Sequence, residues 1–260
     1  MAKPSSSATL LFPDSWTETD IETNKIVVLT SGGVESTIMA GLLPTRCRTV
    51  QPIYVRFGLL WEEAELFHLR RYLHAVSHPH LQELKVLSMP IDDLYQNHWS
   101  TTGKDVPDAS TDDTAVYLPG RNILLTAKAA VWCALNGYSA LALGSLSTNP
   151  FPDATDEFVK GLEASYSLGL AEKVDIIRPV VHLHKEEALK MAAHLPLELS
   201  FSCIRPQVRT TDHEPIHCGT CNKCEERRQA FALVEFDDKT VYATTATNPH
   251  STAVNNLCIK

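Results

Sequence analysis

The apolar positions of the chain alternate between short runs and longer, spaced segments. Short runs rich in β-branched residues are typical of buried strands, whereas apolar residues three or four apart indicate amphipathic helices. On this basis we expect strands at 25–30, 49–57, 84–89, 140–144 and 174–181, with shorter strand-like runs at 8–12 and 240–243. We expect helices from the glycine turn to about Pro44 and at 61–76, 123–136, 156–170, 185–195 and 225–235.

Strands that alternate with helices in this way predict βαβ units and therefore a mostly parallel sheet with right-handed crossovers. We accordingly predict an α/β, Rossmann-like fold with helices flanking the sheet. Two irregular loops, 96–115 and 145–155, interrupt the alternation, and loops of such length are usually functional or disordered. The predicted organisation is a loosely held lead-in at 1–24, an α/β domain at 25–198, a cysteine-rich segment with a helix at 199–236 and a polar tail at 237–260.

A glycine loop joins the first predicted strand to the helix after it, with the sequence Ser31-Gly32-Gly33-Val34-Glu35-Ser36. Two glycines let the backbone approach an anion without obstruction by Cβ atoms. The first N–H groups of the following helix are unpaired donors at the positive end of its dipole. Phosphate binding is one interpretation of this loop, and an ordinary strand-to-helix turn is the other. The predicted phosphate contacts are Ser31, Gly32, Gly33, Val34, Glu35, Ser36 and Thr37.

Four of the seven cysteines gather near the end of the chain, at Cys203, Cys218, Cys221 and Cys224. Four thiolates at this spacing predict a closed tetrahedral Zn²⁺ site of structural type, and an iron–sulfur cluster is the alternative. His217 stands next to Cys218 and is interpreted as a bystander. The scattered cysteines at 47, 133 and 258 are expected to be small buried hydrophobic residues.

Length and composition limit the class of protein. A chain of 260 residues fits one large domain or a domain with a small appendage. The net charge of −8 disfavours broad affinity for nucleic-acid backbones. No apolar run approaches the roughly 20 residues needed to cross a bilayer, and residues 1–20 lack the apolar core of a signal peptide. We therefore expect a cytoplasmic protein with no membrane partner, and we leave open whether it forms a homodimer.

The glycine loop resembles the Ser-Gly-Gly-x-Asp-Ser signature of PP-loop ATP pyrophosphatases, with Glu35 where Asp is usual. Three further stretches extend the likeness: 118–123, 152–159 followed by 167–169, and the cysteine-rich tail that ends in Arg227-Arg228-Gln229-Ala230-Phe231. In this order, over about residues 25–235, the chain resembles the 7-cyano-7-deazaguanine synthase family of queuosine-precursor biosynthesis.

The resemblance implies an adenine nucleotide alpha hydrolase fold with a C-terminal zinc segment, and ATP, Mg²⁺ and Zn²⁺ as cofactors. It implies a ligase that adenylates 7-carboxy-7-deazaguanine, or a close analogue, and converts it with ammonia to an amide, a nitrile or both, releasing AMP and pyrophosphate. The residues expected to carry this chemistry are Glu35, Arg121 and Lys185 in catalysis, and Arg121, Asn122 and Asp153 in substrate binding. His182 and His184 are further acid–base candidates.

The chain departs from the family pattern in two places. Arg56-Phe57-Gly58-Leu59 stands where Asp-Tyr-Gly-Gln is common, and Ala154-Thr155 stands where Cys-Arg is common, so polar groups expected near the substrate are lost. One alternative is therefore the same adenylation used to conjugate the deazaguanine, or another acid, to a protein amine. A second is a non-catalytic nucleotide-binding zinc module, because Glu35 replaces Asp. A sulfur-transferring tRNA enzyme is less favoured, since Cys47 is the nearest cysteine to the loop.

Overall fold

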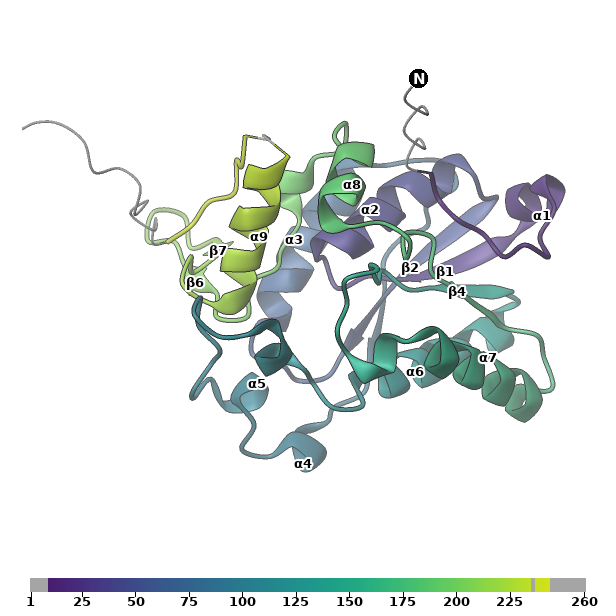
Figure 1. The fold of residues 1–260 in the computed structure, drawn as a ribbon, viewed down its shortest axis with the longest axis horizontal. Coiled ribbons are helices and arrows are strands. Elements are labelled where there is room, and N and C mark those ends of the chain that lie inside the picture. Colours follow the sequence, from purple (N-terminus) through teal and green to yellow (C-terminus); the bar gives the residue numbers. More distant parts are fainter. Residues whose placement is uncertain (1–8, 235–236, 244–260) are drawn as a thin grey trace, which may run out of the picture.

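A five-stranded parallel sheet forms the centre of the computed structural model, which describes residues 9–234 and 237–243 (Figure 1). The strands are β1 (Lys25–Leu29), β2 (Thr49–Arg56), β3 (Lys85–Ser88), β4 (Ala140–Ala142) and β5 (Asp175–Ile177). Their order is β3-β2-β1-β4-β5, and every neighbouring pair is parallel. This confirms the predicted α/β class. The strand order reverses at β1, which is where open α/β sheets place their ligands.

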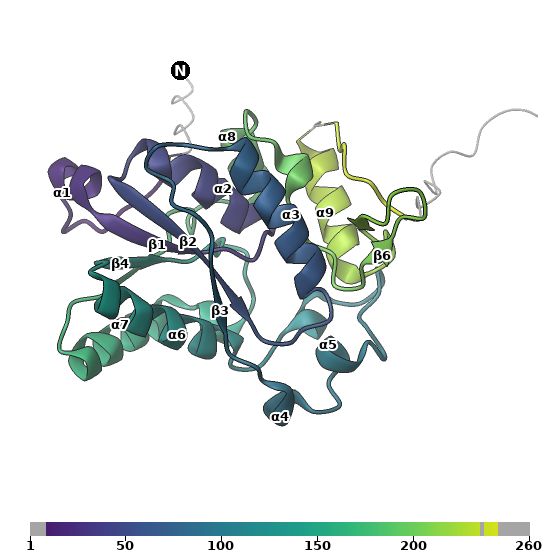
Figure 2. The same cartoon turned by 180° about the vertical axis from the view of Figure 1, so that it is seen from behind.

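Helices cover both faces of this sheet. The α-helices of the structure are α1 (Glu18–Thr23), α2 (Val34–Leu42), α3 (Glu62–Ala75), α4 (Asp92–Tyr95), α5 (Trp99–Thr102), α6 (Arg121–Asn136), α7 (Asp156–Leu170), α8 (Lys185–Met191) and α9 (Asn222–Leu233). Helices α2, α3 and α8 lie on one face, and α6 and α7 lie on the other (Figures 1 and 2). A small antiparallel hairpin, β6 (Gln207–Val208) and β7 (Pro215–Ile216), lies beside α9. None of the described helices is long and apolar enough to cross a membrane.

Alternation along β1 divides the apolar core into two halves. Ile26 and Val28 pack in one cluster with residues of α2, α8 and α9, whereas Val27 and Leu29 pack in the other with residues of α6. All four side chains are buried, because a central parallel strand is covered on both faces. The glycine loop therefore extends from a strand that is covered on both faces.

Several element boundaries differ from the prediction. The fifth strand ends at Ile177 because Pro179 cannot continue the ladder, and α9 begins at Asn222 because Cys221 serves as its N-cap. The described part of 8–12 is not a strand, and 240–243 contributes only an isolated bridge between Tyr242 and His217. Helix α1, which Thr17 caps, was not predicted. Residues 244–260, including Cys258, lie outside the described residues, and the domain boundaries stay predictions.

Candidate active site

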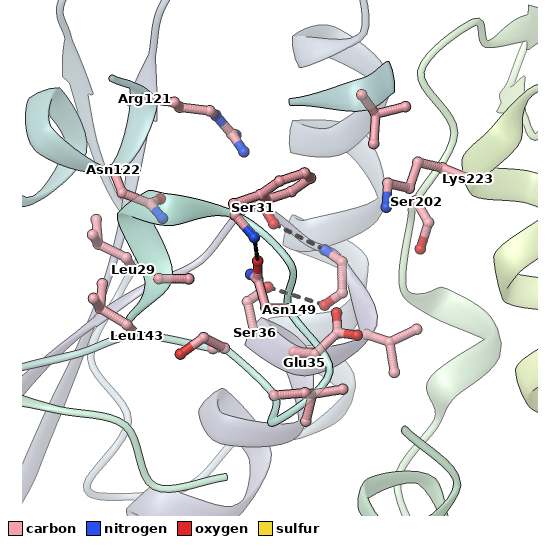
Figure 3. Close-up of a pocket in the computed structure, with 18 of the residues that line it drawn as sticks. Leu29, Ser31, Glu35, Ser36, Arg121, Asn122, Leu143, Asn149, Ser202 and Lys223 are labelled. Carbon is pink, nitrogen blue, oxygen red and sulfur yellow. Dashed lines mark hydrogen bonds between the residues drawn. The ribbon is translucent and has the colours of Figure 1, made fainter. Parts of the chain in front are cut away.

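A cavity of about 420 Å³ opens at the carboxyl ends of β1, β2 and β4. It gathers most of the residues predicted from the sequence: Ser31, Gly33, Val34, Glu35, Ser36, Arg121, Asn122, Asp153 and Lys185. Figure 3 shows Arg121 and Asn122 on one side, Ser202 and Lys223 on the other, and the glycine loop between them. Segments far apart in the sequence thus converge on a single site.

The hydroxyls of the glycine loop hold its own backbone. Gly32 adopts a φ of +88°, which favours glycine, and its N–H donates to the Oγ of Ser36 at 3.2 Å. The Ser36 hydroxyl in turn donates to the carbonyl of Gly33 at 3.0 Å, and the Gly33 N–H donates to the Oγ of Ser31 at 3.3 Å (Figure 3). Both serines therefore shape the turn, and their contact with a phosphate stays a prediction.

The N-terminus of α2 supplies the donors that an anion needs. The first helical hydrogen bond joins the N–H of Thr37 to the carbonyl of Gly33, so the N–H groups of Val34, Glu35 and Ser36 have no partner within the helix. Gly144, after β4, packs against this turn: a Cβ built there would lie 3.2 Å from the Cβ of Glu35. The segment after β4 therefore packs closely against the start of α2, and a side chain at position 144 would crowd it.

A charged cluster borders the loop on the side of α8 and α9. The Nζ of Lys185 lies 3.0 Å from the Oε1 of Glu35 and also pairs with Glu226, which is 2.6 Å from the Nζ of Lys223. Burial of Lys185 disfavours its charged form and lowers its pKa. The attraction of the Glu35 and Glu226 carboxylates is stronger than this effect, so the Lys185 pKa is raised overall. Burial likewise opposes ionisation of Glu226, yet the two lysines lower its pKa to about 2. Lys185 therefore carries a positive charge beside the loop.

On the opposite side, Arg121 and Asp153 present buried polar atoms. Asp153 accepts the N–H of Asn122 at 3.2 Å through Oδ2, and the Asn122 side chain donates to the Asp153 carbonyl at 3.0 Å. Within the described part of the chain, the Nε of Arg121 and the Oδ1 of Asp153 have no hydrogen-bond partner. Burial raises the Asp153 pKa. One of these atoms is a hydrogen-bond donor on a cation and the other is an acceptor on a carboxyl group. Together they fit a ligand that carries both an anionic group and hydrogen-bond donors.

Sequence reasoning missed a buried glutamate in the cavity wall, Glu65. Glu65 of α3 is 7% exposed and accepts a hydrogen bond from the Tyr54 hydroxyl at 2.5 Å. Burial raises the Glu65 pKa to about 7, although the nearby Arg121 guanidinium acts in the opposite direction. The only sequence signal was that Glu65 falls among the apolar positions of an amphipathic helix, where a charged residue is unusual.

Aromatic side chains form the rest of the cavity wall. Trp61 stacks on Trp99 with a centroid distance of 5.6 Å, and Tyr117 faces Phe151 at 5.0 Å. All four residues line the cavity, and flat aromatic walls suit a planar heterocycle. The Trp99 contribution shows that the loop 96–115 is part of the site, as its length suggested.

Other predicted residues lie away from the cavity lining. Thr37 is buried and donates its hydroxyl to the Val34 carbonyl at 2.8 Å, while Gly32 acts through its backbone turn. His182 and His184 are exposed and do not line the cavity. The family pattern has an arginine at the position of Thr155, which this chain lacks. A different arginine lies nearby, because Arg178 lines the cavity and donates to the Ala154 carbonyl at 2.7 Å.

The four clustered cysteines form a compact group with metal-ligand geometry. Their sulfur atoms all lie within 4.8 Å of one another, and the Cys203–Cys221 and Cys218–Cys224 pairs are both 3.9 Å apart. Tetrahedral Zn–S bonds of about 2.3 Å place sulfurs roughly 3.8 Å apart, so the donor set fits Zn²⁺. His217 is outside this group, and its ring accepts the Ser202 N–H at 3.2 Å.

The loop 96–115 also packs against the cysteine group. The Asn222 N–H donates to the Pro107 carbonyl at 3.0 Å, and its side-chain amide donates to the Thr111 carbonyl at 2.9 Å. The Ala109 N–H donates to the carbonyl of Thr220, which lies between two of the cysteines. This loop therefore contacts both the cavity and the metal-binding segment.

The remaining described cysteines do not reach the cavity. Cys47 and Cys133 are buried in apolar surroundings, and burial raises the pKa of each thiol to about 12. Neither thiol lines the site. This disfavours a sulfur-transfer mechanism that would use Cys47.

The sheet order, the glycine loop at its reversal point and the four-cysteine segment define an adenine nucleotide alpha hydrolase-like protein of the PP-loop class. More specifically, the chain belongs to the family "Queuosine biosynthesis protein QueC", whose profile matches residues 25–235. The chain is 26% identical to the 7-cyano-7-deazaguanine synthase of Methanobrevibacter smithii, over 85% of this chain and 98% of that protein. It is 28% identical to the Methanothermobacter thermautotrophicus enzyme of the same name, over 84% and 99%.

Solved structures show weaker similarity. A 4-thiouridine synthetase–RNA complex with bound ATP is 17% identical, with a TM-score of 0.42, over 82% of this chain and 50% of that one.

Proposed function

We propose that this protein is an ATP-dependent 7-cyano-7-deazaguanine synthase, which converts the carboxylate of 7-carboxy-7-deazaguanine into a nitrile in two adenylation steps. The observation that carries the proposal is the family match over 25–235, which spans both the loop and the cysteine cluster. The names and near-complete coverage of the two archaeal relatives support the same activity.

In the first step, a carboxylate oxygen of the substrate attacks the α-phosphorus of ATP, and the bond to pyrophosphate breaks. Ammonia then displaces AMP and loses a proton, which leaves the amide. In the second step, the amide oxygen attacks a second ATP. Loss of AMP and of the amide protons gives the nitrile. Each product molecule therefore accounts for two AMP and two pyrophosphate.

The glycine loop is suited to hold the leaving pyrophosphate. The N–H groups of Val34, Glu35 and Ser36 point from the positive end of α2, and the Lys185 ammonium adds a full charge beside them. Glu35 is the residue that would face Mg²⁺, which neutralises charge on the departing pyrophosphate when it is bound. A longer carboxylate than Asp still fits here, because Lys185 holds it at the cavity edge.

The other side of the cavity is suited to hold the deazaguanine. Arg121 offers to the carboxylate, or to the transferring phosphoryl group, a buried Nε that no described residue pairs with. Asp153 offers to the N–H edge of the base a carboxylate oxygen that is likewise unpaired among the described residues, and Asn122 fixes the orientation of Asp153. The aromatic pairs supply planar surfaces on which the base stacks and from which water is excluded.

The proposal is tested by incubating metal-loaded protein with 7-carboxy-7-deazaguanine, ammonia, ATP and Mg²⁺. We expect two AMP per nitrile, measured by chromatography and mass spectrometry. Lys185→Met should abolish most of the AMP release, whereas Lys190→Met, an exposed lysine on the same helix, should not. Absence of AMP above background would contradict the proposal. A mass increase on a co-purified protein, with no free nitrile, would favour conjugation to a protein amine.

A further inference from the structure

The ammonium group of Lys185 is held by carboxylates from two different elements. Glu35 approaches it from α2, at the glycine loop, and Glu226 approaches it from α9. The two carboxylates come from opposite ends of the sequence, and Lys185 itself is the first residue of α8. The ion pairs therefore join three helices around one nitrogen atom.

Both carboxylates stand on segments with little freedom to move. Gly144 packs against the backbone of Glu35, where even a methyl group would lie 3.2 Å from the Glu35 carbonyl carbon. Glu226 lies in the first turns of α9, whose N-cap is Cys221 and which includes Cys224. The Lys223 ammonium, 2.6 Å from the second oxygen of Glu226, fixes the direction of that carboxylate.

A lysine on a flexible four-carbon stem needs such support in order to act at one position. If Glu35 were its sole partner, Lys185 would be drawn onto the carboxylate that faces the metal–pyrophosphate complex. Glu226 draws the ammonium toward α9, and Lys223 balances the added negative charge. The cavity edge then carries two positive and two negative groups, and the position of Lys185 is set between the two carboxylates.

We propose that Glu226 is a positioning residue, which holds the Lys185 ammonium where it stabilises the leaving pyrophosphate. This inference rests on the proposed function and adds to it a residue of α9 that acts through Lys185. Because the leaving group gains negative charge in the transition state, the position of Lys185 affects turnover more than ATP binding.

The experiment measures AMP release for Glu226→Gln at saturating substrate, with Glu225→Gln as the matched control. Glu225 is the neighbouring residue on α9, pairs with Arg228 and does not line the cavity. We expect Glu226→Gln to lower kcat by about tenfold with KM for ATP within about threefold, since contacting residues couple appreciably. Glu226→Asp should restore much of the rate, and Glu225→Gln should match the wild type. Bound metal should be unchanged in all three.

A double-substitution cycle separates positioning from general damage. In a Lys185→Met background, measured with radiolabelled ATP, Glu226→Gln should cause no further loss beyond about twofold. An equal loss in both backgrounds would overturn the inference, because Glu226 would then act without Lys185. The inference would also be overturned if the wild type is active and Glu226→Gln releases AMP with the same kcat. A wild type that releases no AMP would instead contradict the proposed function, and the inference with it.

Discussion

A side chain at position 144 would place its Cβ 3.1 Å from the backbone nitrogen of Ser36. That nitrogen is one of the free donors at the start of α2, so the absence of a side chain keeps the donor accessible. The atoms that this Cβ would meet include the Ser36 nitrogen and the Glu35 carbonyl carbon, both of which belong to the backbone. Glycine at position 144 therefore leaves the Ser36 N–H uncovered.

We accordingly predict that Gly144→Ala weakens ATP binding and destabilises the fold by about 1–3 kcal/mol, as overpacking typically does. Calorimetric titration with ATP and thermal unfolding measure the two effects. Gly161→Ala is the control, because a Cβ at Gly161 of α7 would meet no atom within 4 Å. Normal ATP affinity in Gly144→Ala would contradict this account of the loop.

Glu35→Gln should slow AMP release about a hundredfold, or roughly 3 kcal/mol, if Glu35 supports the leaving pyrophosphate. The change keeps the size of the side chain and removes its charge. Ser31→Ala should cost less, about 1 kcal/mol, because the Ser31 hydroxyl makes one neutral hydrogen bond within the loop. Glu35→Asp should remain within a few-fold of the wild type or exceed it. A Glu35→Gln protein with wild-type turnover would remove the loop from the proposed mechanism.

The raised pKa of Glu65 predicts a pH-dependent stability. Between about pH 4.5 and 7 the folded protein keeps the Glu65 proton, whereas the unfolded chain releases it. The contribution of Glu65 to stability therefore falls as pH rises through this range, by roughly 3 kcal/mol in total. Glutamine does not titrate, so Glu65→Gln does not lose stability in this way. The Tm of the variant minus the Tm of the wild type should therefore increase from pH 4.5 to pH 7.

The control for the loss of a glutamate from α3 is Glu63→Gln, an exposed neighbour that pairs with Arg56. A Tm difference for Glu65→Gln that is constant with pH would mean that Glu65 is ionised throughout. Because Glu65 lines the cavity, ATP turnover of the variant is a useful second measurement.

Removal of one cysteine ligand should release the metal. We expect about one zinc per chain in the wild type, and loss of it in Cys221→Ala, because a four-ligand site rarely survives with three. Metal-binding free energy in small zinc modules is roughly 10 kcal/mol or more, so the segment around α9 should unfold first. Cys133→Ala, a buried cysteine outside the cluster, should cost stability and keep the metal. A brown protein that contains iron and sulfide would contradict the zinc assignment and show that the cysteines hold an iron–sulfur cluster.

The sheet could be predicted from the sequence because its strands are short β-branched runs separated by amphipathic helices. Ile26, Val27, Val28 and Leu29 form an uninterrupted apolar run, which is what a strand covered on both faces requires. The glycine loop and the cysteine spacing were equally visible, since each depends on residues that are near neighbours in the chain. The hairpin β6–β7 and helix α1 were missed because two-residue strands and a single capped turn carry no periodic signal.

The composition of the cavity was less predictable, because it depends on contacts between distant segments. Glu65 and Glu226 are ordinary helical glutamates in the sequence, and only the fold places Tyr54 against one and Lys185 against the other. Arg178 was likewise not expected, since it approaches the loop at Ala154 from the end of a different strand. Periodicity indicates that a residue faces inward, but it does not identify the partner.

The packing of 96–115 against the cysteine segment also affects the protease sensitivity of the protein in a chelating or oxidising solution. Peptide groups at Pro107, Ala109 and Thr111 bond to Thr220 and Asn222, whose positions the cysteines fix. When the metal leaves, the peptide groups of this loop lose their hydrogen-bond partners. The loop then becomes accessible to proteases. Limited proteolysis after chelation should therefore cut first within 103–111, a nick that also releases Trp99 from the cavity wall. The rate of that cut would then report metal loss in a protein that still contains its intact parallel sheet.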